Sequence, residues 1–409
     1  ISLIFSNKMV CKLKTKKKRF NMAKIFVSFF IAFVLAQNSF AQNSLSDSLI
    51  NANISGEARI FYFDRDRKTS HEDILATGVL LNYETLDFYG FKAGLTLQTA
   101  TNPWANKASK DMFIKDMTTK GARLSQGYLD YTVSNTSFRA GRTFLSTPLV
   151  AGSGSRLIKE SFEGIHLTNK DIENTTLGFV YIDKFQARTD KKGDIGNFEE
   201  YKDGAYSVYI KNNSISNLSF VSSFAKIDDY IKDESNLDIY YAEAIYKNSL
   251  KSLNYDLNAQ YWLNKYNHQN IDKIDAYALK FGLNYSDFSS YFAYSKISND
   301  KVAINQLLHG VGNGSDTIYT NSLIGSYNYE PNMEAYALNL EYKLSSIFKV
   351  GTLYTYADIK NTEQVSYSGV YTNMDFNSLL KGLSSVVQYE KIKKDKNENE
   401  LRIKLFYKF

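Results

Sequence analysis

The sequence predicts an all-β fold in which eighteen antiparallel strands close into a transmembrane β-barrel. Three observations lead to this prediction. Apolar and polar side chains alternate with a period of two along most of residues 54–409, the alternating segments are about ten residues long, and several carry tyrosine at both ends. A barrel of sixteen strands is the alternative, because the segments around 136–169 and 371–391 alternate less clearly.

The alternation is clearest in the last ten residues. One face carries Leu401, Ile403, Leu405, Tyr407 and Phe409. The other face carries Glu400, Arg402, Lys404 and Lys408, with Phe406 as the one exception. A strand in a barrel wall has hydrocarbon on one side and solvent on the other, so the two faces fit lipid and lumen. The same pattern recurs in residues 91–98, 255–261, 277–285 and 336–343.

Tyrosine marks the ends of several apolar stripes. Tyr277 and Tyr285 flank one stripe and Tyr336 and Tyr342 another, with aliphatic or Phe residues between them. This order suits a strand that crosses both interfaces of a bilayer, because the phenol hydroxyl stays wet while the ring lies at headgroup depth. Strands of soluble sheets are usually about five or six residues long, whereas roughly ten are needed to cross a membrane at a tilt.

The pattern sets the expected order of strands and connections. We expect strands near residues 54–63, 74–84, 88–99, 123–133, 136–144, 162–169, 174–183, 204–211, 217–226, 238–247, 253–262, 274–285, 288–297, 333–343, 347–357, 371–380, 383–391 and 399–409. Tight connections are expected at 84–87, 285–288 and 343–346, and long ones at 100–122, 145–161, 184–203 and 298–332. Short turns of such barrels face the periplasm and long loops face outside, which makes Gly310–Gly314 an expected extracellular tip.

The N-terminal residues have the features of an export signal. Met22-Ala23-Lys24 is a charged start, residues 25–36 are apolar, and Ser39-Phe40-Ala41 is a small-x-small cleavage site. The twelve apolar positions fall short of the roughly twenty that a spanning helix needs. We therefore expect a signal peptide at 22–41, cut after Ala41, an upstream extension at 1–21, and a short periplasmic tail at 42–53 before the barrel of 54–409.

Removing this leader changes the charge and cysteine content. Eight of the 49 basic residues and none of the 43 acidic ones lie in residues 1–41, which leaves 41 basic residues and a net charge of −2. The basic character that would support nucleic-acid binding thus belongs mostly to the leader. Cys11, the only cysteine, lies there too, so export through an oxidising compartment needs no disulfide.

Motifs for catalysis or metal binding are weak. The four histidines, His71, His166, His268 and His309, show no H-x-x-x-H or H-E-x-x-H spacing. Ser153 lies between two glycines but lacks the rest of G-x-S-x-G. We expect no active site, no metal and no cofactor.

Three segments resemble the Opr-type (OprD-like) outer-membrane porin family of Gram-negative bacteria. The first is Ser55-Gly56-Glu57-Ala58-Arg59-Ile60-Phe61-Tyr62-Phe63, similar to the opening strand. The second and most specific joins Gly141-Arg142-Thr143-Phe144-Leu145-Ser146-Thr147-Pro148-Leu149 to Ser155-Arg156-Leu157-Ile158-Lys159-Glu160-Ser161-Phe162-Glu163-Gly164. The third is the aromatic ending with Tyr407 and Phe409, similar to the terminal strand that the barrel-assembly machinery recognises.

The resemblance implies an eighteen-stranded barrel whose third extracellular loop, here Leu145–Ser161, folds inward as a constriction loop. The pore-constriction residues carried over are Arg142, Pro148, Arg156, Lys159 and Glu160. Family members often carry a ladder of basic side chains along the pore and favour small solutes with a carboxylate, possibilities that include amino acids. The chain departs from the family at 151–154, where Ala-Gly-Ser-Gly replaces an acidic or Asn/Asp-rich stretch, and this leaves the preferred solute open.

Charged residues on the inward rows are the other candidate site. The pore-lining charges predicted from the alternation are Glu57, Arg59, Lys92, Arg139, Lys280, Glu341, Lys343, Lys349, Arg402 and Lys404, together with Glu390 and Glu400. A charged lumen with low-dielectric walls would steer ions and zwitterions. The alternative is that these charges only keep the lumen wet and pair with each other.

The expected function is an outer-membrane porin, a passive diffusion channel for small hydrophilic solutes. An enzymatic barrel would need convergent catalytic residues at the rim, which we cannot assemble. A hydrophobic-solute transporter would need a plug, and a structural or adhesive barrel would have no open bore. The expected partners are outer-membrane lipid and lipopolysaccharide, the barrel-assembly machinery and small hydrophilic solutes, with no nucleic acid, and the chain as a monomer or a homotrimer.

Overall fold

The computed structural model describes residues 44–231, 235–266, 273–298, 307–315, 317–324, 330–359, 363–394 and 397–409. Contacts divide the chain into two units, 1–44 and 45–409, and all the described helices and strands lie in the second. The predicted signal peptide and Cys11 lie outside the described residues.

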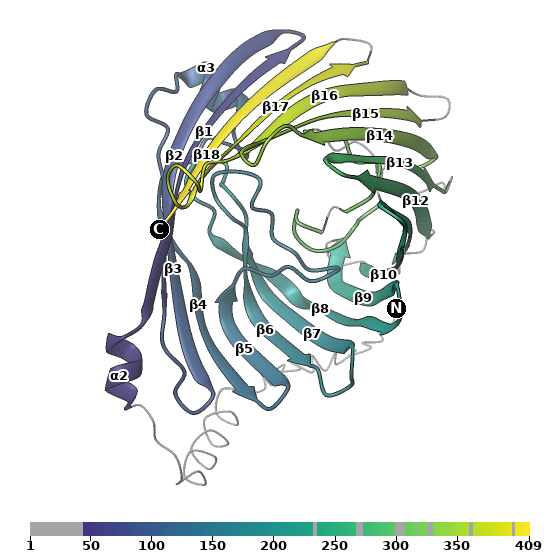
Figure 1. Cartoon of the computed structure of the whole chain (residues 1–409). Coiled ribbons are helices and arrows are strands. Elements are labelled where there is room, and N and C mark those ends of the chain that lie inside the picture. Colours follow the sequence, from purple (N-terminus) through teal and green to yellow (C-terminus); the bar gives the residue numbers. More distant parts are fainter. Residues whose placement is uncertain are drawn as a thin grey trace, which may run out of the picture. The chain divides into compact units, whose positions relative to one another are not determined.

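Strands dominate the second unit (Figure 1). They are β1 (Asn53–Arg67), β2 (Ser70–Glu84), β3 (Phe91–Ala100), β4 (Gly121–Val133), β5 (Thr136–Thr143), β6 (Ser161–Asn169), β7 (Thr175–Gln186), β8 (Phe198–Ile215), β9 (Leu218–Ile231), β10 (Ser235–Leu250), β11 (Leu253–Tyr266), β12 (Ile274–Tyr285), β13 (Phe288–Ile297), β14 (Met333–Lys343), β15 (Phe348–Ile359), β16 (Glu363–Asp375), β17 (Leu383–Lys393) and β18 (Glu398–Lys408). The eighteen-stranded prediction is confirmed, and the sixteen-stranded alternative is not.

The strands form one closed antiparallel sheet. Each strand pairs with the next along the chain, and β18 pairs with β1 to complete the ring. At this seam Glu57 lies opposite Lys408 and Asp66 opposite Asn399, so the pairing runs along nearly the whole of β18. Closure gives each strand two neighbours, which the backbone N–H and C=O groups require in hydrocarbon.

Outward and inward faces follow the predicted alternation. On β12, Leu279 and Phe281 are 51% and 41% exposed, whereas Ala276 and Ala278 have no exposed surface. Side chains in register share a face, because successive residues of a strand point to opposite sides of the sheet. The exposed apolar rows form the outer surface, and Tyr277 lies there as the tyrosine pattern predicts.

Several predicted strand limits are wrong, and the regions around β16 and around the β7–β8 connection differ most. The strand expected at 371–380 is β16, which ends at Asp375, and residues 376–382 form the turn to β17. Asn377 N and Nδ2 donate to Asp375 Oδ1 at 2.9 and 2.6 Å, and Gly382 has a φ of +87°, so local turn chemistry ends the strand despite the apolar residues that follow. The long connection expected at 184–203 covers only 187–197, because β7 and β8 extend beyond the predicted limits.

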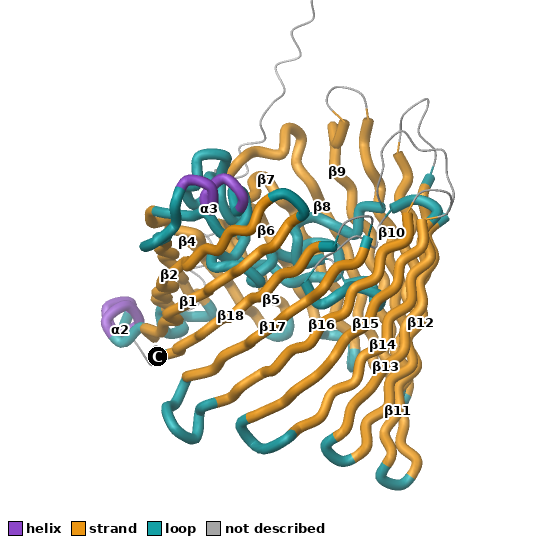
Figure 2. The backbone as a smooth tube through the Cα atoms, turned by 90° about the horizontal axis from the view of Figure 1, so that it is seen from above, coloured by secondary structure: helices purple, strands orange, loops and turns teal. Residues whose placement is uncertain are grey.

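The alternation of connection lengths is only partly as predicted. Tight turns gather at one end of the barrel (Figure 2), and the longest connections, 101–120, 144–160 and 298–332, belong to the other end, but that end also carries the two-residue turn between β1 and β2. The β3–β4 connection contains α3 (Lys107–Met112), whose first turn is capped by Asn106 Oδ1 accepting from Ser109 N at 2.8 Å. The predicted N-terminal tail contains α2 (Leu45–Ile50). Neither described helix is long and apolar enough to cross a membrane.

Candidate functional site: two loops inside the barrel

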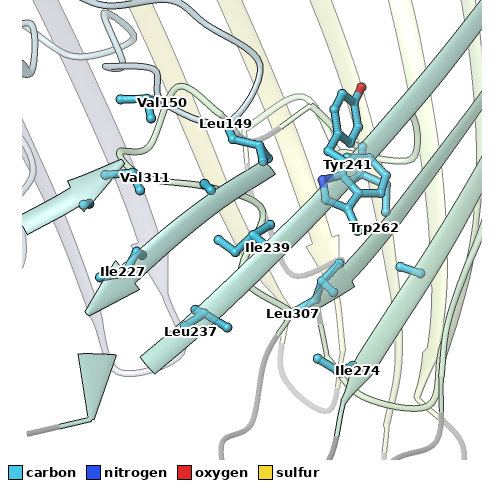
Figure 3. Packing of buried hydrophobic residues seen from close by; sticks show 14 of the residues in the cluster. Leu149, Val150, Ile227, Leu237, Ile239, Tyr241, Trp262, Ile274, Leu307 and Val311 are labelled. Carbon is cyan, nitrogen blue, oxygen red and sulfur yellow. The ribbon is translucent and has the colours of Figure 1, made fainter. Parts of the chain in front are cut away.

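The β5–β6 connection, residues 144–160 and here called loop 3, folds into the barrel (Figure 1). Its turn begins with Thr147, whose N donates to Val150 O at 2.9 Å, and Pro148 supplies the fixed φ that suits the second position of such a turn. Leu149 and Val150 have no exposed surface and join one apolar cluster with inward residues of the wall, among them Trp262 (Figure 3). The inward constriction loop of the predicted fold is therefore present.

A second loop meets loop 3 inside the barrel. The β13–β14 connection, residues 298–332 and here called loop 7, is described at 298, 307–315, 317–324 and 330–332. Val311 N donates to Leu149 O at 2.7 Å, and Ala151 N donates to Val311 O at 3.0 Å. Gly310–Gly314 is thus not the extracellular tip that we expected. A Cβ on Gly312 would lie 2.4 Å from Ala151 O, so glycine allows the two backbones to approach.

The Glu160 carboxylate joins three connections. Its Oε2 accepts from Ser153 N at 2.9 Å within loop 3 and from Asn313 N at 3.0 Å in loop 7. Its Oε1 lies 3.3 Å from Arg188 Nε, which belongs to the β7–β8 connection. Only 1% of Glu160 is exposed, so this buried charge is compensated by the donors that converge on it.

Side chains of the wall hold the end of loop 3. Arg59 Nη1, on β1, donates to Leu157 O at 2.8 Å and to Arg156 O at 3.2 Å. Gln98, on β3, makes a reciprocal pair with the Lys159 backbone, accepting from its N and donating to its O, both at 2.9 Å. The loop position is therefore fixed by backbone contacts, and the Lys159 side chain is left out of them.

An ion network connects loop 3 to the β1–β18 seam. Arg156 Nε donates to Asp116 Oδ1 of the β3–β4 connection, and Arg65 Nη2 donates to Asp116 Oδ2 at 2.7 Å. Glu400 accepts from Arg65 Nε at 2.8 Å and from Arg402 Nε at 2.7 Å. Burial opposes ionisation of Asp116, but the nearby charges of Arg156, Arg65 and Arg402 outweigh it and hold the pKa of this carboxyl well below its usual range.

Two buried phenylalanines lie beneath these cations. Phe63 has the guanidinium of Arg402 4.8 Å and that of Arg156 5.5 Å from its ring centre, and Lys404 Nζ lies 5.9 Å from the ring centre of Phe61. Cations over aromatic faces are attracted by the ring quadrupole. Sequence reasoning did not single out these rings, although they share the inward parity of Arg59.

Loop 7 is bound to the wall at two places, on β10 to β12 opposite the seam and on β17 beside it. Tyr319 Oη donates to Glu243 Oε1 at 2.6 Å, and Lys280 Nζ lies 4.7 Å from the Tyr319 ring centre. Further along, Glu390 Oε1 accepts from Leu323 N at 2.8 Å. Glu243 was not among the predicted residues, although it lies within an expected strand and has the inward parity of Ile239 and Tyr241. Glu243 lies on β10, nine strands from β1 in the ring, so it faces the basic seam across the lumen.

The other predicted charges lie on inward rows of the wall and form local pairs. Lys349 Nζ lies 3.2 Å from Glu341 Oε1, and Lys280 Nζ lies 4.0 Å from Asp256 Oδ2. Arg139 Nε donates to Asp130 Oδ1 at 2.6 Å. The same inward faces carry Glu57, beside Arg59, and Lys92 and Lys343.

Arg142 lies elsewhere. It is on β5 opposite Gly127, which lies opposite the exposed outward residue Leu95. Its Nε donates to Glu163 Oε2 at 2.7 Å, and Lys184 Nζ donates to Glu163 Oε1 at 2.8 Å. Register thus places Arg142 on the outer face of the barrel, and its assignment to the constriction is wrong.

No group of three or more His, Cys, Asp and Glu among the described residues is arranged to hold a metal ion. The apolar cluster under the two loops gathers inward residues of β6 to β15, so the lumen is less uniformly polar than the alternation predicted. Figure 3 shows Leu149 and Val311 of the loops against Ile227 and Ile239 of this wall.

Comparisons with known proteins agree with this architecture. The family model "outer membrane porin, OprD family" matches residues 48–407. Among solved structures, Acinetobacter baumannii OccAB2 is 19% identical with a TM-score of 0.74, over 89% of this chain and 99% of that one. Pseudomonas aeruginosa OccK3 (OpdO) is 17% identical with a TM-score of 0.71, over 89% and 97%. These likenesses show the fold.

No curated protein matches this chain in a sequence comparison. The family match covers far more than half of the 409 residues, and the closed barrel with its inward loop agrees with it. The chain therefore belongs to the OprD family of outer-membrane porins, channels of the Gram-negative outer membrane that let small solutes pass.

Proposed function

We propose that this porin favours small hydrophilic solutes that carry a carboxylate. The observation that supports the proposal is the excess of basic side chains where loop 3 meets the β1–β18 seam. Five basic residues lie in this contact network and a sixth, Lys159, lies beside it, against the three acids Glu57, Asp116 and Glu400. The basic residues are Arg59, Arg65, Arg156, Lys159, Arg402 and Lys404.

An uncompensated positive region in a low-dielectric channel raises the local concentration of anions. Acidic residues lie across the lumen, with Glu243 on β10 and Asp256 on β11. Charges of opposite sign on facing walls suit a solute that carries both, such as an amino acid. The alternative, that the charges only solvate the lumen, is supported by local pairs such as Lys349 with Glu341.

The test is electrical. The refolded protein in planar bilayers separating unequal KCl concentrations should show discrete conductance steps and a reversal potential on the anion-selective side. Swelling of liposomes containing the protein should be faster with propanoate than with propionamide, which has a similar size and no charge. Near-zero conductance would overturn the channel itself, and cation selectivity would overturn only the carboxylate preference.

The proposal extends to export and assembly. The 22–41 segment would be removed as a signal peptide and 42–53 would remain as a periplasmic tail, which the N-terminal sequence of the outer-membrane protein can test. Tyr407 and Phe409 would serve the barrel-assembly machinery, and the outward Arg142 is a candidate contact for lipopolysaccharide phosphate. We assign the chain no catalytic activity and no cofactor, and native mass spectrometry in detergent would distinguish a monomer from a homotrimer.

A further inference from the structure

Helix α2 packs against the outside of the barrel wall (Figure 1, Figure 2). Leu49 O accepts a hydrogen bond from Tyr83 Oη at 2.7 Å, and Ser48 O accepts one from Leu86 N at 3.1 Å. Ser48 is 1% exposed, so the side of the helix that carries it lies on the wall. Tyr83 follows Leu81 by two positions on β2, and the exposed Leu81 belongs to the outward row. The helix is therefore fixed to the lipid-facing side of β2.

The apolar side chains of α2 point away from this contact. Leu45 is 54% exposed, Leu49 45% and Ile50 77%. Ile54, which follows at the start of β1, is 70% exposed. Only short or polar residues separate these four aliphatic side chains. Exposed apolar surface of this kind indicates contact with a membrane or with another protein.

The surface of α2 continues the lipid-facing rows of the wall. Ile54 lies opposite Tyr83 on β2, and Tyr83 lies opposite the exposed Leu95 on β3. The hydroxyl of a tyrosine at the end of a lipid-facing row stays at headgroup depth. The hydrogen bond from Tyr83 to Leu49 therefore places α2 where the wall leaves the hydrocarbon, at the end of the barrel with the short turns.

The far side of the barrel has the same combination. Leu250, at the end of β10, is 68% exposed and lies opposite Leu253 on β11, which lies opposite Tyr285 on β12. Exposed aliphatic side chains thus accompany the tyrosines at this end on both sides of the ring. A bilayer covers such residues all round, whereas a protein partner covers one side. A stable protein interface also needs about 800 Å² on each partner, more than three apolar side chains provide.

We propose that α2 is an interfacial anchor, with Leu45, Leu49 and Ile50 inserted among the phospholipids of the inner leaflet. An amphipathic helix at this level buries its apolar side roughly 5–10 Å into the boundary between headgroups and acyl chains. The segment before the barrel would then be held at the membrane, and the start of β1 would be held beside its seam with β18. The inference goes beyond the proposed function, because it holds whichever solute passes.

The experiment measures quenching of tryptophan fluorescence by brominated phospholipids in vesicles that contain the protein. The native Trp104 and Trp262 give the background, which the parent protein measures. The emission added by Leu49→Trp should shift to the blue, and bromine near the carboxyl end of the acyl chains should quench it by about half, because an interfacial helix lies at that depth. Ile50→Trp should behave alike, which keeps the test valid if one substitution disturbs the helix.

Two control variants calibrate the depth. Leu338→Trp, on the exposed outward row of β14, should be quenched most by bromine deep in the chains. Lys349→Trp, on an inward row of β15, should not be quenched by either lipid. Unquenched emission from both L49W and I50W, beside a quenched L338W, would overturn the anchor. Blue-shifted emission that is not quenched and reverts when the protein is diluted with lipid would assign the surface to a second copy and would also overturn it. An unquenched L338W would instead overturn the membrane barrel and with it the proposed function.

Discussion

The ring of Phe409 covers Gly56 at the seam where the barrel closes. Gly56 N donates to Phe409 O at 2.8 Å, and Phe409 N donates to Gly56 O at 3.0 Å. A Cβ at position 56 would lie 2.3 Å from Cζ of the ring. The aromatic end of the chain therefore packs flat on the first strand because that strand presents no side chain there.

A side chain at Gly56 should displace this ring and weaken the seam. We expect Gly56→Val to lower the temperature of the heat-modifiable gel shift and to slow refolding into detergent, because the last backbone pairs of β1 and β18 must separate to make room. Gly127→Ala is the matched control on the outer face, where an added Cβ has nothing closer than 3.7 Å. If the two variants refold alike, the contact has no role in closure.

Glu160→Gln should loosen the junction of the inner loops. The substitution removes the charge beside Arg188 and places an amide NH₂ where two backbone N–H groups now donate. Breaking a buried ion pair typically destabilises its surroundings by about 3–5 kcal/mol. We expect noisier single-channel currents with added conductance substates, while the barrel keeps its melting temperature. Glu173→Gln, in an exposed turn, should behave as the parent. Quiet currents from E160Q would contradict this role.

Gly312→Val tests the approach of loop 7 to loop 3. The residue has a φ of +83°, and its Cβ would overlap Ala151 O. The left-handed backbone alone costs a β-branched residue about 1–2 kcal/mol, so the two loops should separate and single-channel conductance should rise. Gly154→Ala is the control, since its Cβ would make ordinary contacts from 3.6 Å outward. Identical conductance of G312V and the parent would show that this contact does not narrow the channel.

Most of the wall could be predicted from the sequence, because a membrane barrel imposes one period on every strand. The predicted end of β16 was too late in the chain, because Asp375 and Asn377 form a turn inside a segment that still looks apolar. The error at Arg142 was avoidable. Arg142 lies three positions from Arg139. Residues an odd number of positions apart on a regular strand point to opposite faces, so Arg142 and Arg139 could not both line the lumen.

The inner site was harder to predict. Leu149 and Val311 are hydrogen-bonded although more than 150 positions separate them in the sequence, and no local sequence pattern predicts such a pairing. The apolar inward residues Ile239 and Ile274 are explained only once both loops cover them. Glycine at 310, 312 and 314 was the available signal, but glycine marks an exposed tip as readily as a close backbone approach.

Phe281→Pro should impair assembly of the wall. Phe281 lies in the middle of β12 and pairs with Leu257 and Phe292 on its two neighbours. Proline removes a backbone donor and leaves an acceptor unpaired in hydrocarbon, where this costs several kcal/mol. We expect little heat-modifiable protein in the membrane fraction. Phe281→Leu keeps the donor and an apolar outward side chain, and should assemble normally. Parent-like migration of F281P would count against a membrane-embedded strand here.

Acid should release loop 3 through Asp116. Its folded-state pKa lies below the ordinary value of 3.8, so ionised Asp116 stabilises the folded network at pH values above 3.8, and this contribution is lost as pH falls from there through the folded value. We expect parent currents to stay quiet from pH 7 to about pH 4 and to become noisy only in stronger acid. Asp116→Asn removes the carboxylate from Arg156 and Arg65 and should be noisy already at pH 7. Asp87→Asn, in an exposed turn at the other end of the barrel, should leave the acid profile unchanged. Because only the Asp116 variant lacks the titrating carboxylate, a profile in which D116N and the parent share one acid transition would assign that transition to another group.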